Sequence, residues 1–115
     1  MWTNYYLQKN KCKCCGRDDQ LHIGKSSYWR EFAFKWYNYL DEDWVEFLWL
    51  QSIKSYGDTL LAIKKAKIID ECWKYISQKD FKSLVRKKKN EMKHKESERS
   101  YFDSTGNYFS FYNFF

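Results

Sequence analysis

The feature that most limits the fold of this chain is a run of aromatic residues at alternate positions between residues 28 and 37. In the stretch YWREFAFKWY, alternate positions place Tyr28, Phe32, Phe34 and Trp36 on one side. Successive side chains of a β-strand point to opposite faces of a sheet, so this spacing predicts an amphipathic strand. The chain is therefore expected to build a sheet around this segment.

Other segments supply partners for that strand. TNYYLQ at 3–8 alternates and is expected to form the first strand, and QLHIGKSS leads into the aromatic run, so a hairpin or a three-stranded antiparallel sheet is expected. AKIIDECWKYIS at 66–77 predicts two short strands around a turn near Glu71 and Cys72. The end of the chain, YFDSTGNYFSFYNFF, predicts a closing hairpin that turns at Thr-Gly-Asn.

Two helices are predicted between these strands. The segment 40–57 has Asp41 as its expected N-cap and Gly57 as its expected C-terminal end. A second helix is expected to start after Ser77, with its buried side formed by Phe81, Leu84 and Val85. The predicted fold is α+β, a small antiparallel sheet with hairpins packed against two helices. The 115 residues are expected to form a single compact domain, with a mobile loop at 90–100.

The first helix has more apolar surface than one sheet can cover. Trp49, Leu50 and Ile53 are expected to project away from its sheet-facing stripe, which consists of Trp44, Val45, Phe47 and Leu48. Such a helix is either sandwiched inside the fold or covered by a second subunit. We expect a homo-oligomer.

The charge balance limits the class of partner. The net charge of +6 comes mainly from lysine, with a dense basic run at 86–89. The run is either a solvated helix face or a surface that attracts the phosphates of nucleic acid or of a small nucleotide. The chain shows no apolar core of signal-peptide length and no run long enough to span a membrane, so we expect a cytoplasmic protein without membrane contact.

A cluster of cysteines precedes the second strand. Cys12 and Cys15 have the C-x-x-C-G spacing of a zinc knuckle, and His22 is a candidate third ligand. The fourth ligand is open among Cys14, Cys72 and His94. A strong zinc signature would contain a second C-x-x-C pair, which this chain lacks. A thiol-rich turn without metal, with His22 as a hydrogen-bonded strand residue, is the alternative to a structural zinc site.

The sequence HIGKSS at 22–27 resembles the end of a phosphate-binding P-loop, but the comparison fails. That loop needs a glycine five residues before Gly24, where this chain has Asp19. One interpretation is a smaller site, in which a glycine turn, Lys25 and the hydroxyls of Ser26 and Ser27 hold an anion. The alternative is an ordinary hairpin turn with polar residues in solvent.

Arg30 extends this candidate anion site. It falls between Tyr28 and Phe32 on the aromatic side of 28–37, where a guanidinium needs a carboxylate, a ring or a ligand phosphate. An internal ion pair is one outcome. The other is a basic, aromatic pocket suited to a nucleotide or a single strand. Its expected residues are Tyr6, Arg17, Lys25, Ser26, Ser27, Tyr28, Trp29 and Arg30.

Three segments carry a resemblance to known sequences. NYYL at 4–7, CKCCGR at 12–17 and HIGKSS at 22–27, with later likeness in KIIDE and DSTGNYFSF, resemble a group of small uncharacterised phage proteins. This chain departs from the pattern at Cys72 and Trp73, where a glycine-containing turn is expected. The resemblance implies a phage accessory protein, of a kind that often inhibits host defence by binding a nucleotide signal or a defence protein.

These observations rank the possible functions. The chain has no Ser-His-Asp order, no H-E-x-x-H and no paired carboxylates in a glycine-framed loop, so we do not expect an enzyme. The favoured hypothesis is an anti-defence protein that sequesters a small phosphorylated nucleotide signal without catalysis. The alternatives are a single-stranded nucleic-acid-binding module and a direct protein inhibitor of a host defence complex.

Overall fold

The structure is a computed structural model that describes residues 2–9, 20–27, 31–89 and 100–110. The described residues form one sheet of seven strands and three helices, which confirms the α+β class. The strands are β1 (Trp2–Gln8), β2 (Gln20–Ser27), β3 (Ala33–Lys35), β4 (Lys67–Asp70), β5 (Tyr75–Ile76), β6 (Ser100–Phe102) and β7 (Tyr108–Ser110). The helices are α1 (Glu42–Leu48), α2 (Tyr56–Ile63) and α3 (Gln78–Lys88).

The sheet has the strand order β5-β4-β1-β2-β3-β7-β6. β3 and β7 run parallel, whereas the other neighbouring pairs in the described sheet are antiparallel. The sheet is thus mixed rather than antiparallel throughout. The parallel pair joins the closing hairpin β6–β7 to the free side of β3, a long-range contact that local patterns do not reveal.

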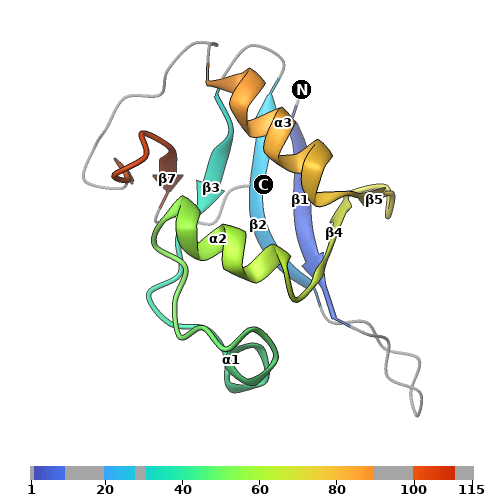
Figure 1. The fold of residues 1–115 in the computed structure, drawn as a ribbon, viewed down its shortest axis with the longest axis vertical. Helices are drawn as coiled ribbons and strands as arrows, with labels where there is room; N and C mark the ends of the chain where they lie inside the picture. The colour runs from blue at the N-terminus through green and yellow to red at the C-terminus, as the bar shows by residue number, and fades with distance from the viewer. Residues whose placement is uncertain (1, 10–19, 28–30, 90–99, 111–115) are drawn as a thin grey trace.

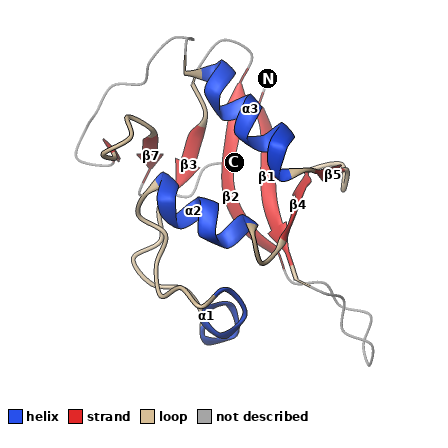
Figure 2. Cartoon of the chain, in the orientation of Figure 1, coloured by secondary structure: helices blue, strands red, loops and turns tan. Residues whose placement is uncertain are grey.

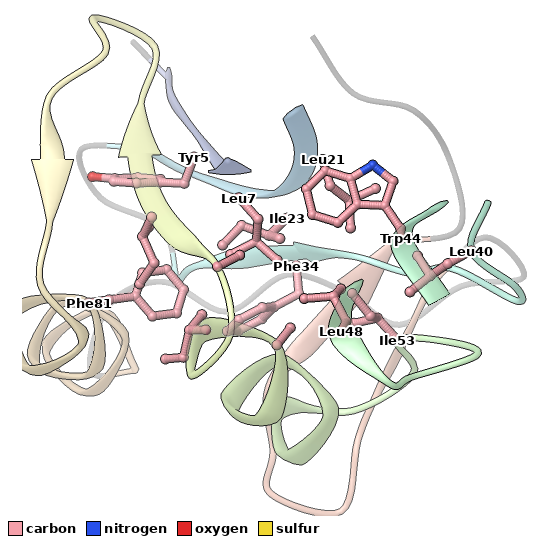
Figure 3. Close-up of a cluster of buried hydrophobic side chains, with 14 of the residues drawn as sticks. Tyr5, Leu7, Leu21, Ile23, Phe34, Leu40, Trp44, Leu48, Ile53 and Phe81 are labelled. Carbon is pink, nitrogen blue, oxygen red and sulfur yellow. The ribbon is translucent and has the colours of Figure 1, made fainter. Parts of the chain in front are cut away.

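The helices α2 and α3 lie over one side of the sheet, and α1 lies near one end of it (Figure 1; Figure 2). Between the helices and the strands is a continuous apolar core, in which Phe34 and Phe109 stack with ring centroids 5.0 Å apart. Figure 3 shows Phe34 among the side chains of β1, β2 and the α1 region. Phe81 of α3 packs edge-on against Phe32, with centroids 5.4 Å apart.

Strand register defines two faces of the sheet. Tyr5 and Leu7 point to the helix-covered face, because the Tyr5 ring packs against Phe81 of α3, with centroids 6.3 Å apart, and Leu7 lies two residues further along β1. The opposite face is called the second face here. Following the pairings across the strands, it carries Asn4, Tyr6, His22, Lys25, Ala33, Lys35, Ile69, Tyr75, Phe102 and Tyr108.

The prediction of a single helix over 40–57 is wrong. α1 begins after Asp41 as expected but ends at Leu48, because Trp49 adopts a left-handed conformation (φ 60°) as its C-cap. Ile53 then pairs with Tyr37 in a β-bridge and is 1% exposed, so it is covered within the chain rather than projecting from a helix.

A second helix, which was not predicted, occupies the next segment. α2 starts after Ser55, whose side chain accepts a hydrogen bond from the Asp58 N–H group. Gly57 therefore lies in the first turn of α2 and does not end a helix. Helix caps are local signals, but this one competes with the Gly57 stop signal two residues later.

The remaining elements follow the sequence patterns. β4 and β5 flank a turn at Glu71 and Cys72, and Trp73 supplies the left-handed residue there (φ 65°) where glycine is usual. α3 starts after Ser77, whose hydroxyl accepts from the Asp80 N–H group. The β6–β7 hairpin turns through Gly106 (φ 81°). The predicted loop at 90–100 lies outside the described residues except for Ser100, which begins β6.

The aromatic run forms a shorter strand than predicted. β3 comprises Ala33–Lys35, while positions 28–30 lie outside the described residues. Trp36 still donates its N–H to the Ser110 carbonyl, 3.0 Å away. None of the helices that the structure describes combines the length and the apolar character needed to cross a lipid bilayer.

Candidate functional site

The predicted glycine turn at HIGKSS is wrong, because these residues form β2 in the middle of the sheet. Gly24 is paired with Tyr5 on one side and with Phe34 on the other. Lys25 is likewise opposed by Asn4 and Ala33. Main-chain N–H groups of a strand with neighbours on both sides serve the sheet ladders, so they do not form an anion-binding loop.

Gly24 has a packing role instead. A Cβ atom at this position would lie 2.4 Å from Cε1 of Phe32 and 2.6 Å from the carbonyl oxygen of Ala33. Both distances are shorter than non-bonded atoms tolerate. Glycine is therefore required here for the close approach of β3 and the Phe32 ring, and not for a special backbone angle.

The pleat of β2 separates the two residues predicted to act together. Ser26 is 7% exposed and lies next to Lys25, so the two side chains point to opposite faces. On the helix-covered face, Ser26 shares a side-chain hydrogen bond with Tyr5. Ser27 ends β2 opposite Trp2. Ser26 therefore belongs to the packed interior and does not accompany Lys25 toward a ligand.

The structure brings a different set of residues together on the second face. A β-bulge shifts the β1–β2 register between Tyr5 and Tyr6, so His22 and Lys25 share this face of β2 although they are three residues apart. Lys35 of β3 lies there too, because it is two residues after Ala33, which is paired with Lys25. The Tyr6 ring stacks on the His22 imidazole with centroids 4.9 Å apart. We call these four residues, together with Tyr37, the second-face cluster.

Tyr37 fixes one side of the second-face cluster. Its hydroxyl donates a hydrogen bond to the His22 carbonyl oxygen, with an O···O distance of 2.6 Å. The Lys35 ammonium lies over the Tyr37 ring, with Nζ 5.4 Å from the centroid, within the range of a cation–π interaction. Tyr37, which follows β3, is therefore held against His22 of β2.

Burial and mutual repulsion shape the charges of the cluster. Burial lowers the pKa of His22, the hydrogen bond with the Gly24 carbonyl opposes that change, and the charges of Lys25 and Lys35 lower it again. Burial also lowers the pKa of Lys25 and of Lys35, which is only 7% exposed. A negative charge placed against these three groups would favour their protonated forms.

His22 also bears on the zinc hypothesis. Its Nε2 atom lies 3.0 Å from the Gly24 carbonyl oxygen. A carbonyl oxygen accepts only, so Nε2 carries the proton and Nδ1 is the nitrogen that a metal would use. Among the residues that the structure describes, no three His, Cys, Asp or Glu side chains are grouped as metal ligands. Cys12, Cys14 and Cys15 lie outside the described residues, so zinc stays a prediction.

Four other predicted ligand residues also lack a described position. Arg17, Tyr28, Trp29 and Arg30 lie outside the described residues. Of the expected pocket, the structure therefore brings Tyr6 and Lys25 to one face and places Ser26 on the other. Lys35 was missed as a site residue, because alternation places it opposite Phe34 whereas the expected pocket was on the aromatic side with Arg30. The β2–β3 register, in which Lys25 is paired with Ala33, brings Lys35 to the face of Lys25.

Comparisons with protein-family models, with curated proteins and with solved structures find no match to this chain. A function has to be inferred from the chain's own residues.

Proposed function

We propose that the chain binds a small phosphorylated nucleotide at the second-face cluster. The observation that carries the proposal is the convergence of Lys25 and Lys35, both partly desolvated, on one face beside the stacked Tyr6 and His22 rings. Ammonium groups in partly buried positions form strong hydrogen bonds with phosphate, and aromatic rings offer flat surfaces for a base. The two kinds of group occur here on adjacent strands.

Sequestration fits this cluster better than turnover. A general base needs an available lone pair near the reacting proton. The Nε2 atom of His22 donates to the Gly24 carbonyl within its own strand, so Nδ1 is the nitrogen that keeps a lone pair. Burial and the charges of Lys25 and Lys35 lower the pKa of His22, which makes that nitrogen a weaker base. We therefore propose a non-catalytic role, in which the ligand is held and released unchanged.

Calorimetry with a panel of cyclic dinucleotides, ADP and ADP-ribose tests this proposal. At least one should bind reversibly. Lys25→Ala should weaken that binding about ten-fold to a hundred-fold, because a charge-assisted hydrogen bond contributes roughly 1.5 to 3 kcal/mol. Lys79→Ala is the matched control, since it removes the same charge from an exposed position at the start of α3. Equal losses in both variants would point to general charge attraction and contradict the site.

A single-stranded nucleic acid is the second candidate, and one observation favours it. The second face carries aromatic residues on four strands, namely Tyr6, Tyr75, Phe102 and Tyr108. Aromatic side chains spread over a sheet can stack successive bases. Binding of random single-stranded DNA with a steep salt dependence, without heat from the nucleotide panel, would favour this candidate. Failure of both ligands would favour a host protein as the target.

A zinc site at Cys12, Cys15 and His22, with Cys14 as one candidate fourth ligand, remains part of the proposal. Protein purified without added metal should carry about one zinc per chain and lose thermal stability in chelator. Cys15→Ser should abolish the retained metal. A zinc content well below half an equivalent would remove the site, and Cys15→Ser should then have only a packing effect.

The biological setting and the assembly are also proposals. The resemblance at 4–7, 12–17 and 22–27 supports a phage accessory, anti-defence protein that acts in the host cytoplasm. The exposed Trp49, at 82% of its surface, supports a homo-oligomer in which a second copy covers this side chain. Light scattering should then report a dimer or larger assembly, and Trp49→Ser should shift it toward monomer. A wild-type monomer at high micromolar concentration would contradict the oligomer.

A further inference from the structure

A second basic site lies on the helix side of the molecule, between α2 and α3. A cavity of about 270 Å³ opens there, lined by Tyr56, Leu60, Lys82, Val85, Arg86 and Lys89. Leu60 and Val85 supply apolar surface, and three lining residues are cationic. The lining residues of the described chain include no carboxylate. The cavity therefore combines positive charge with an apolar wall.

Helix geometry explains why these cations gather. Lys82, Arg86 and Lys89 are spaced four and three residues apart, which places them along one side of α3. Lys89 is the C-cap residue of that helix. Lys87 belongs to the same basic run but does not line the cavity. The run at 86–89 is thus divided between this cavity and the surrounding surface.

Hydrogen bonds from the β6–β7 turn hold both walls of the cavity. The carboxylate of Asp103 accepts from the Tyr56 N–H group at 2.7 Å, which ties the turn to the start of α2. The Lys89 ammonium donates to the Thr105 carbonyl oxygen at 2.9 Å, which ties the same turn to the end of α3. One turn therefore positions the two helices that line the site.

The Tyr56 ring is positioned by the apolar core. It packs against Phe34 of the core with centroids 5.4 Å apart. Burial raises the pKa of its hydroxyl, and the positive charge of Arg86 opposes that change, which agrees with the guanidinium lying near the ring. A rigid aromatic group and a cation with five donors are therefore present on opposite walls.

We propose that this cavity is a second ligand site, which takes a compact organic phosphate. Its phosphate would lie between Arg86 and Lys82, and its less polar part would lie on Leu60 and Val85. A volume near the lower limit for ligand pockets favours a small molecule over a polymer. The site is independent of the proposed nucleotide site, because the sheet separates the helix side from the second face.

The test uses pyrophosphate and AMP as probes, with binding followed by calorimetry and by two-dimensional NMR of the full chain. Both probes should perturb the signals of Tyr56 and Leu60. Arg86→Gln should weaken their affinity about ten-fold or more, because it removes a charge-assisted contact. Lys87→Gln is the matched control on the same helix, because Lys87 does not line the cavity, and it should leave the affinity unchanged.

Several results would overturn this proposal. Equal losses in Arg86→Gln and Lys87→Gln would show general charge attraction rather than a site. Loss of AMP and pyrophosphate binding in Lys25→Ala, with Arg86→Gln unaffected, would assign these ligands to the second face. Tighter binding of single-stranded DNA than of either probe, lost in Arg86→Gln, would assign the cavity to a polymer. If Arg86→Gln fails to fold, Lys82→Gln supplies the same comparison.

Discussion

The two sides of β2 put different residues of one short segment to different uses. Toward the helices, Leu21, Gly24 and Ser26 are buried and leave little space for change. Away from the helices, His22 and Lys25 keep polar groups at partly exposed positions. A segment with the letters of an anion-binding loop is therefore a central strand whose glycine serves packing. The comparison predicts that changes on one side affect stability and that changes on the other affect binding.

The largest effect is expected from Gly24→Ala on the packed side. The added methyl group would meet the Ala33 carbonyl oxygen, which cannot move away without disturbing the β2–β3 pairing. We expect the free energy of unfolding to fall by roughly 2 to 3 kcal/mol, the upper part of the range for overpacked cores. Urea unfolding followed by tryptophan fluorescence measures it.

Gly57→Ala provides the matched control for that change. A Cβ atom at Gly57 would lie 3.6 Å from the Ser55 hydroxyl oxygen, an ordinary contact. Alanine also favours a helix over glycine by up to about 1 kcal/mol, so this variant should be as stable as the wild type or more stable. Equal stability of the two alanine variants would contradict the close approach of β3 to Gly24.

On the second face, Lys35→Met should weaken ligand binding without lowering stability. Burial lowers the pKa of Lys35, so its charged form carries a cost that methionine removes. We expect stability to stay equal or to rise by up to about 1 kcal/mol. Nucleotide affinity should fall about ten-fold, as expected for loss of one charged contact. A variant that loses stability but retains affinity would show that Lys35 serves the fold alone.

Ser26→Ala should separate neighbouring residues of β2. It removes the hydroxyl that bonds Tyr5, so we expect a loss of about 1 kcal/mol in unfolding free energy. Ligand affinity should not change, because this side chain lies on the helix-covered face. Calorimetry and urea unfolding of Ser26→Ala and Lys25→Ala, side by side, provide the measurement. Weaker binding in Ser26→Ala at full stability would return this residue to the ligand site.

The smallest expected effect is the pH dependence that His22 contributes. The folded chain lowers the pKa of His22, so the unfolded chain binds more protons in the range below pH 6.5. Stability from this group is therefore complete above about pH 6.5 and declines as the pH falls through the folded pKa. Urea unfolding between pH 7 and pH 5 should show this decline, and His22→Asn should reduce it. A free energy of unfolding that rises as the pH falls would contradict the lowered pKa of His22 in the folded chain.

Local patterns predicted much of the fold. Period-two alternation identified β1, and the Ser77 cap identified the start of α3. The break after α1 was not predictable, since Trp49 adopts a left-handed angle that favours glycine and only tertiary packing makes it acceptable. The β3–β7 pairing was also not predicted, because strands that are far apart in the sequence leave no local signal of their pairing.

The candidate site was predictable only in part for the same reason. Lys25 was selected from its neighbours in the sequence, and Tyr6 from its aromatic character. The pleat of β2 places Ser26 on the helix-covered face, away from Lys25. An interpretation of this segment as a turn does not predict that separation. Lys35 and the cavity cations Lys82 and Arg86 become candidates only when β3 and α3 are placed beside their neighbours.

The parallel pairing of β3 with β7 has a consequence for synthesis on the ribosome. Residues up to 76 contain the strands β1 to β5, so a nascent chain of that length can already assemble five neighbouring strands. Until residues 108–110 emerge, β3 presents an open edge, including the main chain of Phe34. Exposed edges of this kind template pairing between chains. A pause in translation before the last hairpin would therefore expose a surface prone to association, which β7 closes when it arrives.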